Sequence, residues 1–233
     1  MALLLISARL LAAEPLRIAA ASSLHPLLTQ LATDNIQIIS AASGVLHAQI
    51  TQGARYDLFL TADPKYIHNL VERQRVSDRH RRCLGLSSLA VTTAPGSAPD
   101  LQMLVSRRTG TARLVIADPT LAPFGAAAMD VLDHQGVLSA WAPRLIRARS
   151  AAQAAQILVT GNADIALLPT TLAAAHGLPH VPVSAAWHRP VGYWAAILDR
   201  EEASTAFTTR LQSLLLATPG IRPCPAPDAP GQS

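Results

Sequence analysis

The sequence is poor in aromatic side chains, and this scarcity argues against a nucleic-acid partner. Aromatic residues make up 4% of the 233 residues, and Lys65 is the only lysine. Proteins that bind single-stranded nucleic acids stack the bases on aromatic side chains, and duplex readers carry recognisable helix motifs, which this sequence lacks. Five arginines lie close together between residues 73 and 82. We interpret this basic cluster as a solvated connecting segment and expect no nucleic-acid partner.

Cysteine motifs, paired histidines and glycine-rich loops are also lacking, which argues against metal and nucleotide cofactors. Cys83 and Cys224 are the only cysteines, and their separation excludes a CxxC redox or zinc motif. The histidines form no HExxH or HxH motif, and the glycines form no GxGxxG sequence or phosphate-binding loop. We therefore expect no cofactor and no directly bound metal ion. The two cysteines either form a disulfide in an oxidising compartment or remain separate thiols.

Long hydrophobic runs are lacking after the first residues. Residues 1–13 are apolar and end in small residues before Glu14, which resembles the end of a secretory signal peptide. No later run approaches the ~20 apolar residues needed to cross a bilayer. We interpret residues 1–13 as a signal-peptide remnant and expect a periplasmic protein; the other interpretation is an ordinary first strand. The prolines near the other end predict a flexible tail over residues 223–233.

Strand and helix patterns alternate along most of the chain, which predicts an α/β fold. Short hydrophobic runs predict strands, and amphipathic stretches between them predict helices. The expected strands cover residues 16–21, 35–40, 56–60, 84–93, 114–117, 145–148, 165–168 and 193–198. The expected helices cover residues 24–31, 43–52, 63–71, 125–132, 151–159 and 201–216. Such alternation is typical of parallel or mixed sheets with helices on both faces.

Four junctions between an expected strand and the following helix have the features of an anion-binding site. Ser22 and Ser43 follow the first two strands, and Phe124 and Ala151 lie at the starts of two later helices. The first backbone N–H groups of a helix have no partner within it, and the helix dipole adds partial positive charge there. Ligands of α/β sheets bind where strands end and helices begin. Convergence of the four junctions would form a site for a small oxyanion; otherwise the two serines are only helix caps.

An enzyme is a weaker interpretation of the same residues. Ser43 and His47 lie four residues apart on an expected helix, a spacing that can join a nucleophile to a base. No GxSxG or SxxK motif accompanies them, and no carboxylate is placed to orient the imidazole. Asp57, Asp63 and Asp118 each lie at a strand end or a helix start, where capping explains them. We therefore expect no enzymatic activity.

Several short motifs, in this order and spacing, resemble the periplasmic molybdate-binding proteins of ABC importers. The motifs are Ala19-Ala20-Ala21-Ser22, Ala41-Ala42-Ser43-Gly44-Val45-Leu46, Asp57-Leu58-Phe59-Leu60-Thr61-Ala62-Asp63, Ala117-Asp118-Pro119, Pro123-Phe124-Gly125 and Gly161-Asn162-Ala163-Asp164. The resemblance implies two lobes, each a mixed, mostly parallel sheet flanked by helices, with the ligand cleft between them. We expect residues 14–82 and 195–222 to form lobe I and residues 83–194 to form lobe II.

The resemblance also implies which groups bind the anion. Ser22 and Ser43 would donate hydrogen bonds from hydroxyl and backbone groups of lobe I. Phe124 and Ala151 would donate from backbone N–H groups of lobe II, each at the start of a helix. The molybdenum atom itself would be reached by Ser22 and Ser43 only through the oxygens of molybdate.

One position departs from the family pattern. Many members carry a tyrosine, whose hydroxyl reaches the oxyanion, where this chain has Pro169, and proline has no N–H to donate. Either Thr170 or Thr171 supplies a hydroxyl in its place, or the site uses fewer donors.

The sequence therefore predicts a monomeric extracytoplasmic binding protein that captures molybdate or tungstate by hinge closure. Its partners would be the oxyanion and the membrane permease of an ABC importer. Within this class, the alternative is the same fold binding sulfate, thiosulfate or a small organic acid. From another class, the alternative is an intracellular oxyanion sensor, which would apply if residues 1–13 are not a signal.

Overall fold

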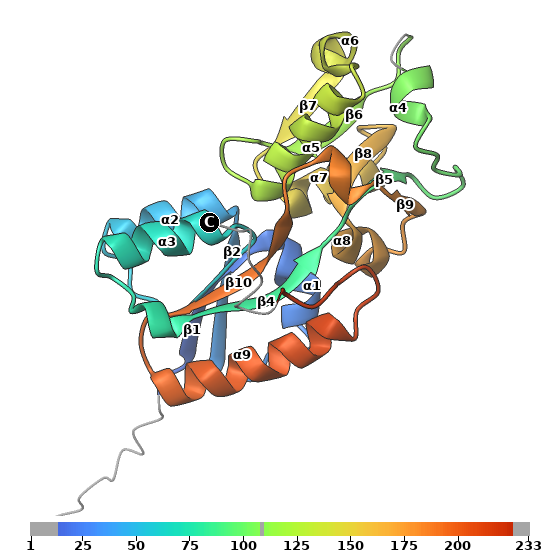
Figure 1. Cartoon of the computed structure of the whole chain (residues 1–233). Coiled ribbons are helices and arrows are strands. Elements are labelled where there is room, and N and C mark those ends of the chain that lie inside the picture. The colour runs from blue at the N-terminus through green and yellow to red at the C-terminus, as the bar shows by residue number, and fades with distance from the viewer. Residues whose placement is uncertain (1–13, 108–109, 226–233) are drawn as a thin grey trace, which may run out of the picture.

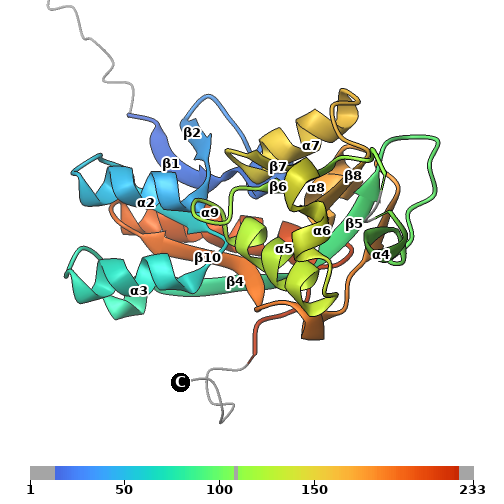
Figure 2. The ribbon, with the colours of Figure 1, turned by 90° about the horizontal axis from the view of Figure 1, so that it is seen from above.

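The protein folds into two α/β lobes, seen from the side in Figure 1 and from above in Figure 2. The computed structural model describes residues 14–107 and 110–225. Each lobe is built on a five-stranded sheet, and the two sheets are separate. The predicted alternation of strands and helices and the two-lobe fold class are thus confirmed. The expected signal remnant, residues 1–13, and residues 226–233 of the expected tail lie outside the described residues.

The sheet of the first lobe has the strand order β2-β1-β3-β10-β4. Its strands are β1 (Leu16–Ala21), β2 (Ile36–Ala41), β3 (Leu58–Thr61), β4 (Arg81–Ser87) and β10 (Val191–Ile197). β1 pairs in parallel with β2 and β3, and β10 runs antiparallel to β3 and β4. The helical elements of this lobe are η1 (Ser22–Leu24), α1 (His25–Leu28), α2 (Ser43–Thr51), α3 (Pro64–Glu72), η2 (Asp78–His80) and α9 (Glu201–Leu216).

The sheet of the second lobe has the strand order β7-β6-β8-β5-β9. Its strands are β5 (Leu89–Thr93), β6 (Leu114–Ala117), β7 (Leu145–Ala148), β8 (Ile165–Pro169) and β9 (His180–Pro182). β6 runs parallel to β7 and β8, and β5 runs antiparallel to β8 and β9. The helical elements are α4 (Met103–Ser106), α5 (Pro123–His134), α6 (Leu138–Trp141), η3 (Ala142–Arg144), α7 (Ala151–Val159), α8 (Thr170–Ala175) and η4 (Ala185–Trp187).

Both faces of each sheet are buried. Along β1, Ile18 and Ala20 pack with α1 and α9, while Ala19 packs with α2 and α3 on the opposite face. In the second lobe, Ile116 packs with α5 and Val115 packs with α7. Successive side chains of a strand point to opposite faces, so a sheet covered on both faces needs strands that are apolar throughout. This requirement explains the continuous apolar runs of the sequence.

Within the described residues, the chain crosses between the lobes at two places, and neither coincides with a boundary expected from the sequence. The expected single strand over residues 84–93 is divided at Ser88, with β4 in the first sheet and β5 in the second. The expected boundaries at 82/83 and 194/195 fall inside β4 and β10, which pair with each other in the first sheet. Hydrophobic patterning reveals a strand but not the sheet that the strand joins, so the boundaries needed the tertiary structure.

A disulfide ties the C-terminal segment to the first sheet. Cys83 of β4 is bonded to Cys224, with the two Cα atoms 6.1 Å apart. Backbone hydrogen bonds of 2.8 Å in both directions join Leu86 to Arg222. Of the two states that the sequence left open for the cysteines, the structure has the disulfide. In the described ranges, no helix has both the length and the apolar character needed to cross a membrane.

Candidate functional site

A small cavity lies between the lobes, where strands of both sheets end. It is lined by Ala21, Ser22, Ser23, Ala42, Ser43, Ala62, Ala122, Pro123, Phe124 and Ala151. The first-lobe residues follow β1, β2 and β3, and the second-lobe residues lie at the starts of α5 and α7. The free space is about 10 Å³, close to the minimum that one water molecule needs. The four junctions singled out in the sequence thus meet around one cavity.

Ser43 presents its hydroxyl to the cavity from the first residue of α2. The residue is 1% exposed, and its Oγ accepts a hydrogen bond of 3.2 Å from the backbone N–H of Ala62. A hydroxyl that accepts in this way keeps its own hydrogen for another acceptor. Ala42 occupies the N-cap position of α2, with no side-chain cap. Ser43 is therefore not a helix cap, and its O–H is available as a donor.

Ser22 links the two lobes across the cavity. Its Oγ accepts a hydrogen bond of 3.4 Å from the backbone N–H of Ala152 in α7. Ser22 was predicted as a donor from the sequence, but its neighbour Ser23, which also lines the cavity and is 2% exposed, was not. The Ser22-Ser23 pair at the end of the first strand was the sequence feature that could have indicated Ser23 as a second donor. Because both serines lie in the single 3-10 turn η1, both side chains stay near the end of β1.

Backbone N–H groups supply the second-lobe side of the cavity. Phe124 and Ala151 occupy the first turns of α5 and α7, and both residues are buried. Pro123 starts α5, at a position where its missing N–H costs nothing. Among residues 14–107 and 110–225, no protein acceptor binds the N–H groups of Ser43, Phe124 or Ala151. Buried N–H groups are normally hydrogen-bonded, so we expect these three N–H groups to bind an acceptor that is not part of the chain.

The cavity attracts negative charge without containing a cation. No charged side chain is among the described residues that line it. The positive potential comes from the N-terminal ends of α2, α5 and α7, whose dipoles point at the cavity. The arrangement therefore offers donors and partial positive charges, which suit a small anion that carries no proton.

The lobes touch each other around the cavity. The backbone N–H of Gly44 in α2 donates a 2.9 Å hydrogen bond to the carbonyl of Leu121, which precedes α5. Ala42 of the first lobe packs against Ala122, Ala151 and Leu172 of the second. These contacts define a closed arrangement of the two lobes.

The threonines considered as replacements for the family tyrosine lie elsewhere. Neither Thr170 nor Thr171 is among the described lining residues. Thr170 is buried next to Gly220, and its Oγ1 has no hydrogen-bond partner within the described chain. The Thr171 hydroxyl forms a 2.9 Å hydrogen bond with the Tyr193 hydroxyl. Pro169 ends β8 opposite Leu89.

The structure does not join Ser43 to His47 as a nucleophile and a base. His47 Nε2 lies 3.0 Å from the side-chain oxygen of Asn69, and burial lowers the pKa of the imidazole, with the Asn69 hydrogen bond acting in the opposite direction. Asp118 accepts hydrogen bonds from the N–H and hydroxyl of Thr120, which lower the pKa of its carboxyl group. In the part of the chain that the structure describes, no three His, Cys, Asp or Glu side chains gather as metal ligands.

Curated proteins that are similar to this chain in sequence include molybdate-binding proteins. The molybdate-binding protein ModA of Rhodobacter capsulatus is 30% identical over 145 residues, which are 62% of this chain and 57% of that protein. ModA of Azotobacter vinelandii is 32% identical over 123 residues, 53% of this chain and 49% of that protein. The chain thus spans about half the length of these two relatives.

Solved structures give the same fold over most of the chain. The periplasmic molybdate-binding protein of Azotobacter vinelandii superposes with a TM-score of 0.73 and 27% identity, covering 85% of this chain and 91% of that one. The sulfate-binding protein SubI of Mycobacterium tuberculosis shares the fold, with a TM-score of 0.64, 17% identity and coverage of 88% and 85%. A family model described as bacterial extracellular solute-binding protein matches residues 16–214. The chain therefore belongs to the family of bacterial extracellular solute-binding proteins.

Proposed function

We propose that this protein captures molybdate or tungstate and delivers it to the membrane permease of an ABC importer. The observation that carries the proposal is the donor set of the cavity, in which serine hydroxyls and buried N–H groups from both lobes converge. The similarity to molybdate-binding proteins of Rhodobacter and Azotobacter supports this choice of anion.

The donor set selects by proton state. A fully ionised tetrahedral dianion accepts hydrogen bonds at every oxygen, and charge-assisted bonds of this kind are about twice as strong as neutral ones. Hydrogen phosphate carries an O–H that needs an acceptor, and the described lining offers mainly donors. Molybdate and tungstate are nearly the same size and should bind with similar affinity. Sulfate is smaller and should fit loosely.

Hinge closure is the capture mechanism that we propose. The closed cavity leaves only about 10 Å³, so an anion larger than water enters while the lobes are apart. Closure then brings Ser22 and Ser43 of the first lobe against Phe124 and Ala151 of the second, around the anion. These donors are fixed by the ends of strands and helices before binding, which lowers the ordering cost.

The protein would act as a monomer outside the cytoplasm, with the permease and the oxyanion as its partners. The family description and the periplasmic relative from Azotobacter vinelandii support this location. Neither a cofactor nor an enzymatic step is part of the proposal, since binding and release of the anion are sufficient for transport.

Isothermal titration of the purified protein with molybdate, tungstate, sulfate and phosphate tests the proposal. We expect one-to-one binding of molybdate and tungstate, with sulfate and phosphate much weaker. Ser43→Ala removes one hydrogen bond to a charged group, worth about 1.5–3 kcal/mol, so affinity should fall by about ten- to 150-fold. Ser213→Ala on α9 is the matched control, because Ser213 Oγ donates only to the Thr209 carbonyl, outside the cavity.

Tighter binding of sulfate than of molybdate would show that the same fold binds another anion than the one proposed. Absence of binding to all four anions would refute the proposed function. Equal affinity of wild type and Ser43→Ala for molybdate would refute the proposed site.

A further inference from the structure

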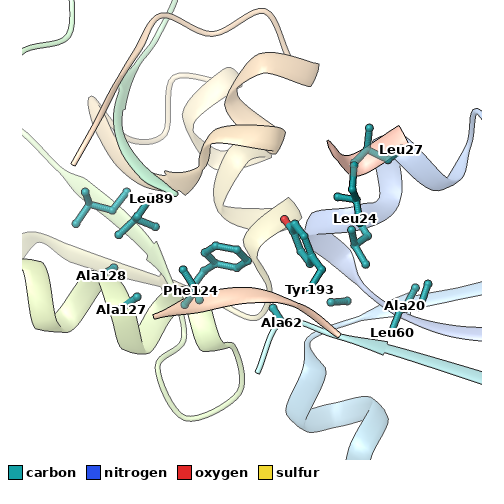
Figure 3. Close-up of a cluster of buried hydrophobic side chains, with 14 of the residues drawn as sticks. Ala20, Leu24, Leu27, Leu60, Ala62, Leu89, Phe124, Ala127, Ala128 and Tyr193 are labelled. Atoms are coloured by element: carbon teal, nitrogen blue, oxygen red, sulfur yellow. The ribbon is translucent and has the colours of Figure 1, made fainter. Parts of the chain in front are cut away.

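Tyr193 is a fully buried tyrosine at the junction of the two lobes. It lies on β10, the strand through which the chain returns to the first sheet, at the point where the pairing with β4 is irregular. Figure 3 shows its ring inside the apolar cluster, with Phe124 on one side and Leu24 on the other. The ring centroids of Tyr193 and Phe124 are 6.0 Å apart. The ring therefore lies directly behind a residue that lines the cavity.

The hydroxyl of Tyr193 forms a hydrogen bond that crosses from the first sheet to the second lobe. It is 2.9 Å from Thr171 Oγ1, at the start of α8 in the second lobe. The hydroxyls of Ser23 and Ser87 in the first lobe also lie close enough to influence its ionisation. Burial is the larger effect and raises the pKa of the phenol, so Tyr193 stays neutral and keeps its hydrogen.

We propose that Tyr193 is a positioning residue that couples closure of the lobes to assembly of the anion-binding donors. This inference rests on the proposed function. Its hydroxyl spans the lobes through Thr171, and its ring supports Phe124, whose N–H faces the cavity. Ser23, which lines the same cavity, is close enough to the Tyr193 hydroxyl to affect the pKa of the phenol.

The coupling follows from the location of the partners. Tyr193 belongs to the first sheet, whereas Thr171 and Phe124 belong to the second lobe, so both contacts cross between lobes. A contact that is made in the closed arrangement and weakened by opening favours the closed arrangement. A buried hydroxyl pair is also costly to separate, because each group would lose its partner. Removing the Tyr193 hydroxyl should therefore weaken anion binding, although it never touches the anion.

A double-mutant cycle on molybdate affinity tests the inference. Tyr193→Phe and Thr171→Val each remove one side of the same hydrogen bond with little change in volume. We expect each variant to weaken molybdate binding about tenfold, the effect of one net hydrogen bond, and the double variant to be no weaker than either. Tyr56→Phe is the matched control, because its hydroxyl donates to Gln49 Oε1 at 2.8 Å within the first lobe; its affinity should equal that of wild type.

A second measurement follows the coupling without any anion. Amide hydrogen exchange should be faster in α8 and in η1 of Tyr193→Phe than in wild type, and unchanged in Tyr56→Phe. Unchanged affinity of Tyr193→Phe, or additive effects in the double variant, would overturn the positioning role and leave only core packing. If the wild-type protein binds no oxyanion, the proposed function fails, but the role of Tyr193 can still be tested by the exchange rates. Unchanged rates in α8 and η1 of Tyr193→Phe would then overturn the inference.

Discussion

Replacing Gly44 with alanine should weaken anion binding while leaving the fold as stable as before, or slightly more so. Gly44 is the second residue of α2 and has an ordinary helical backbone, so alanine is a better helix former there by up to about 1 kcal/mol. In the closed arrangement, however, the new Cβ would lie 3.0 Å from the carbonyl oxygen of Leu121 and 3.0 Å from the Tyr66 hydroxyl. The same substitution thus helps the helix and hinders closure.

The size of the effect follows from these distances. Ordinary contacts of a Cβ atom begin near 3.4 Å, so the Leu121 carbonyl has to withdraw by about 0.4 Å. That shift stretches the 2.9 Å hydrogen bond from Gly44 N–H to Leu121 and costs at most the net value of one bond, about 0.5–1.5 kcal/mol. Molybdate affinity should therefore fall about two- to tenfold.

Titration calorimetry with molybdate and thermal unfolding without it measure the two effects separately. Gly44→Ala combined with Tyr66→Phe removes only the contact with α3 of the same lobe and should leave the affinity as low as in Gly44→Ala, because the carbonyl of Leu121 stays in place. Unchanged affinity in Gly44→Ala would refute the reasoning about closure. A lower melting temperature that accompanies the loss of affinity would show that α2 itself is damaged.

Three further predictions concern the fold. Replacing both Cys83 and Cys224 with serine should lower the free energy of unfolding by up to about 5 kcal/mol for a sequence separation of 141; an unchanged urea midpoint would contradict it. Gly125→Ala places a Cβ 2.3 Å from the Ala117 carbonyl oxygen and should cost at least about 1–3 kcal/mol; circular dichroism during heating measures this, and wild-type stability would count against the close packing of α5 on β6. Burial raises the pKa of Tyr193, so the unfolded chain loses the phenol proton at a lower pH than the folded protein does. The free energy of unfolding should therefore decline as pH rises above about 10. Tyr193→Phe should show a shallower decline in unfolding free energy, and an equal slope would be inconsistent with the raised pKa.

Much of the secondary structure was predictable because its signals are local. The expected segments 145–148, 151–159 and 201–216 coincide with β7, α7 and α9. The two helices, of nine and 16 residues, are long enough to show a repeat of about 3.6 residues. The elements that went unpredicted, such as α8 and β9, are six and three residues long. Segments of this length contain too few repeats to distinguish a helix or strand from a turn.

The sequence by itself determined the α/β class, most of the elements and the junctions at which N–H groups lack partners. These properties depend on residues close together in the chain. Only the tertiary structure decided that the four junctions share one cavity, that Ser23 joins them and that Thr170 does not. It also decided that Cys83 pairs with Cys224, and that the run over residues 84–93 divides between two sheets. The physical reason is that these outcomes depend on which distant strands pair and in what order, whereas hydrophobic periodicity records only that a strand is buried.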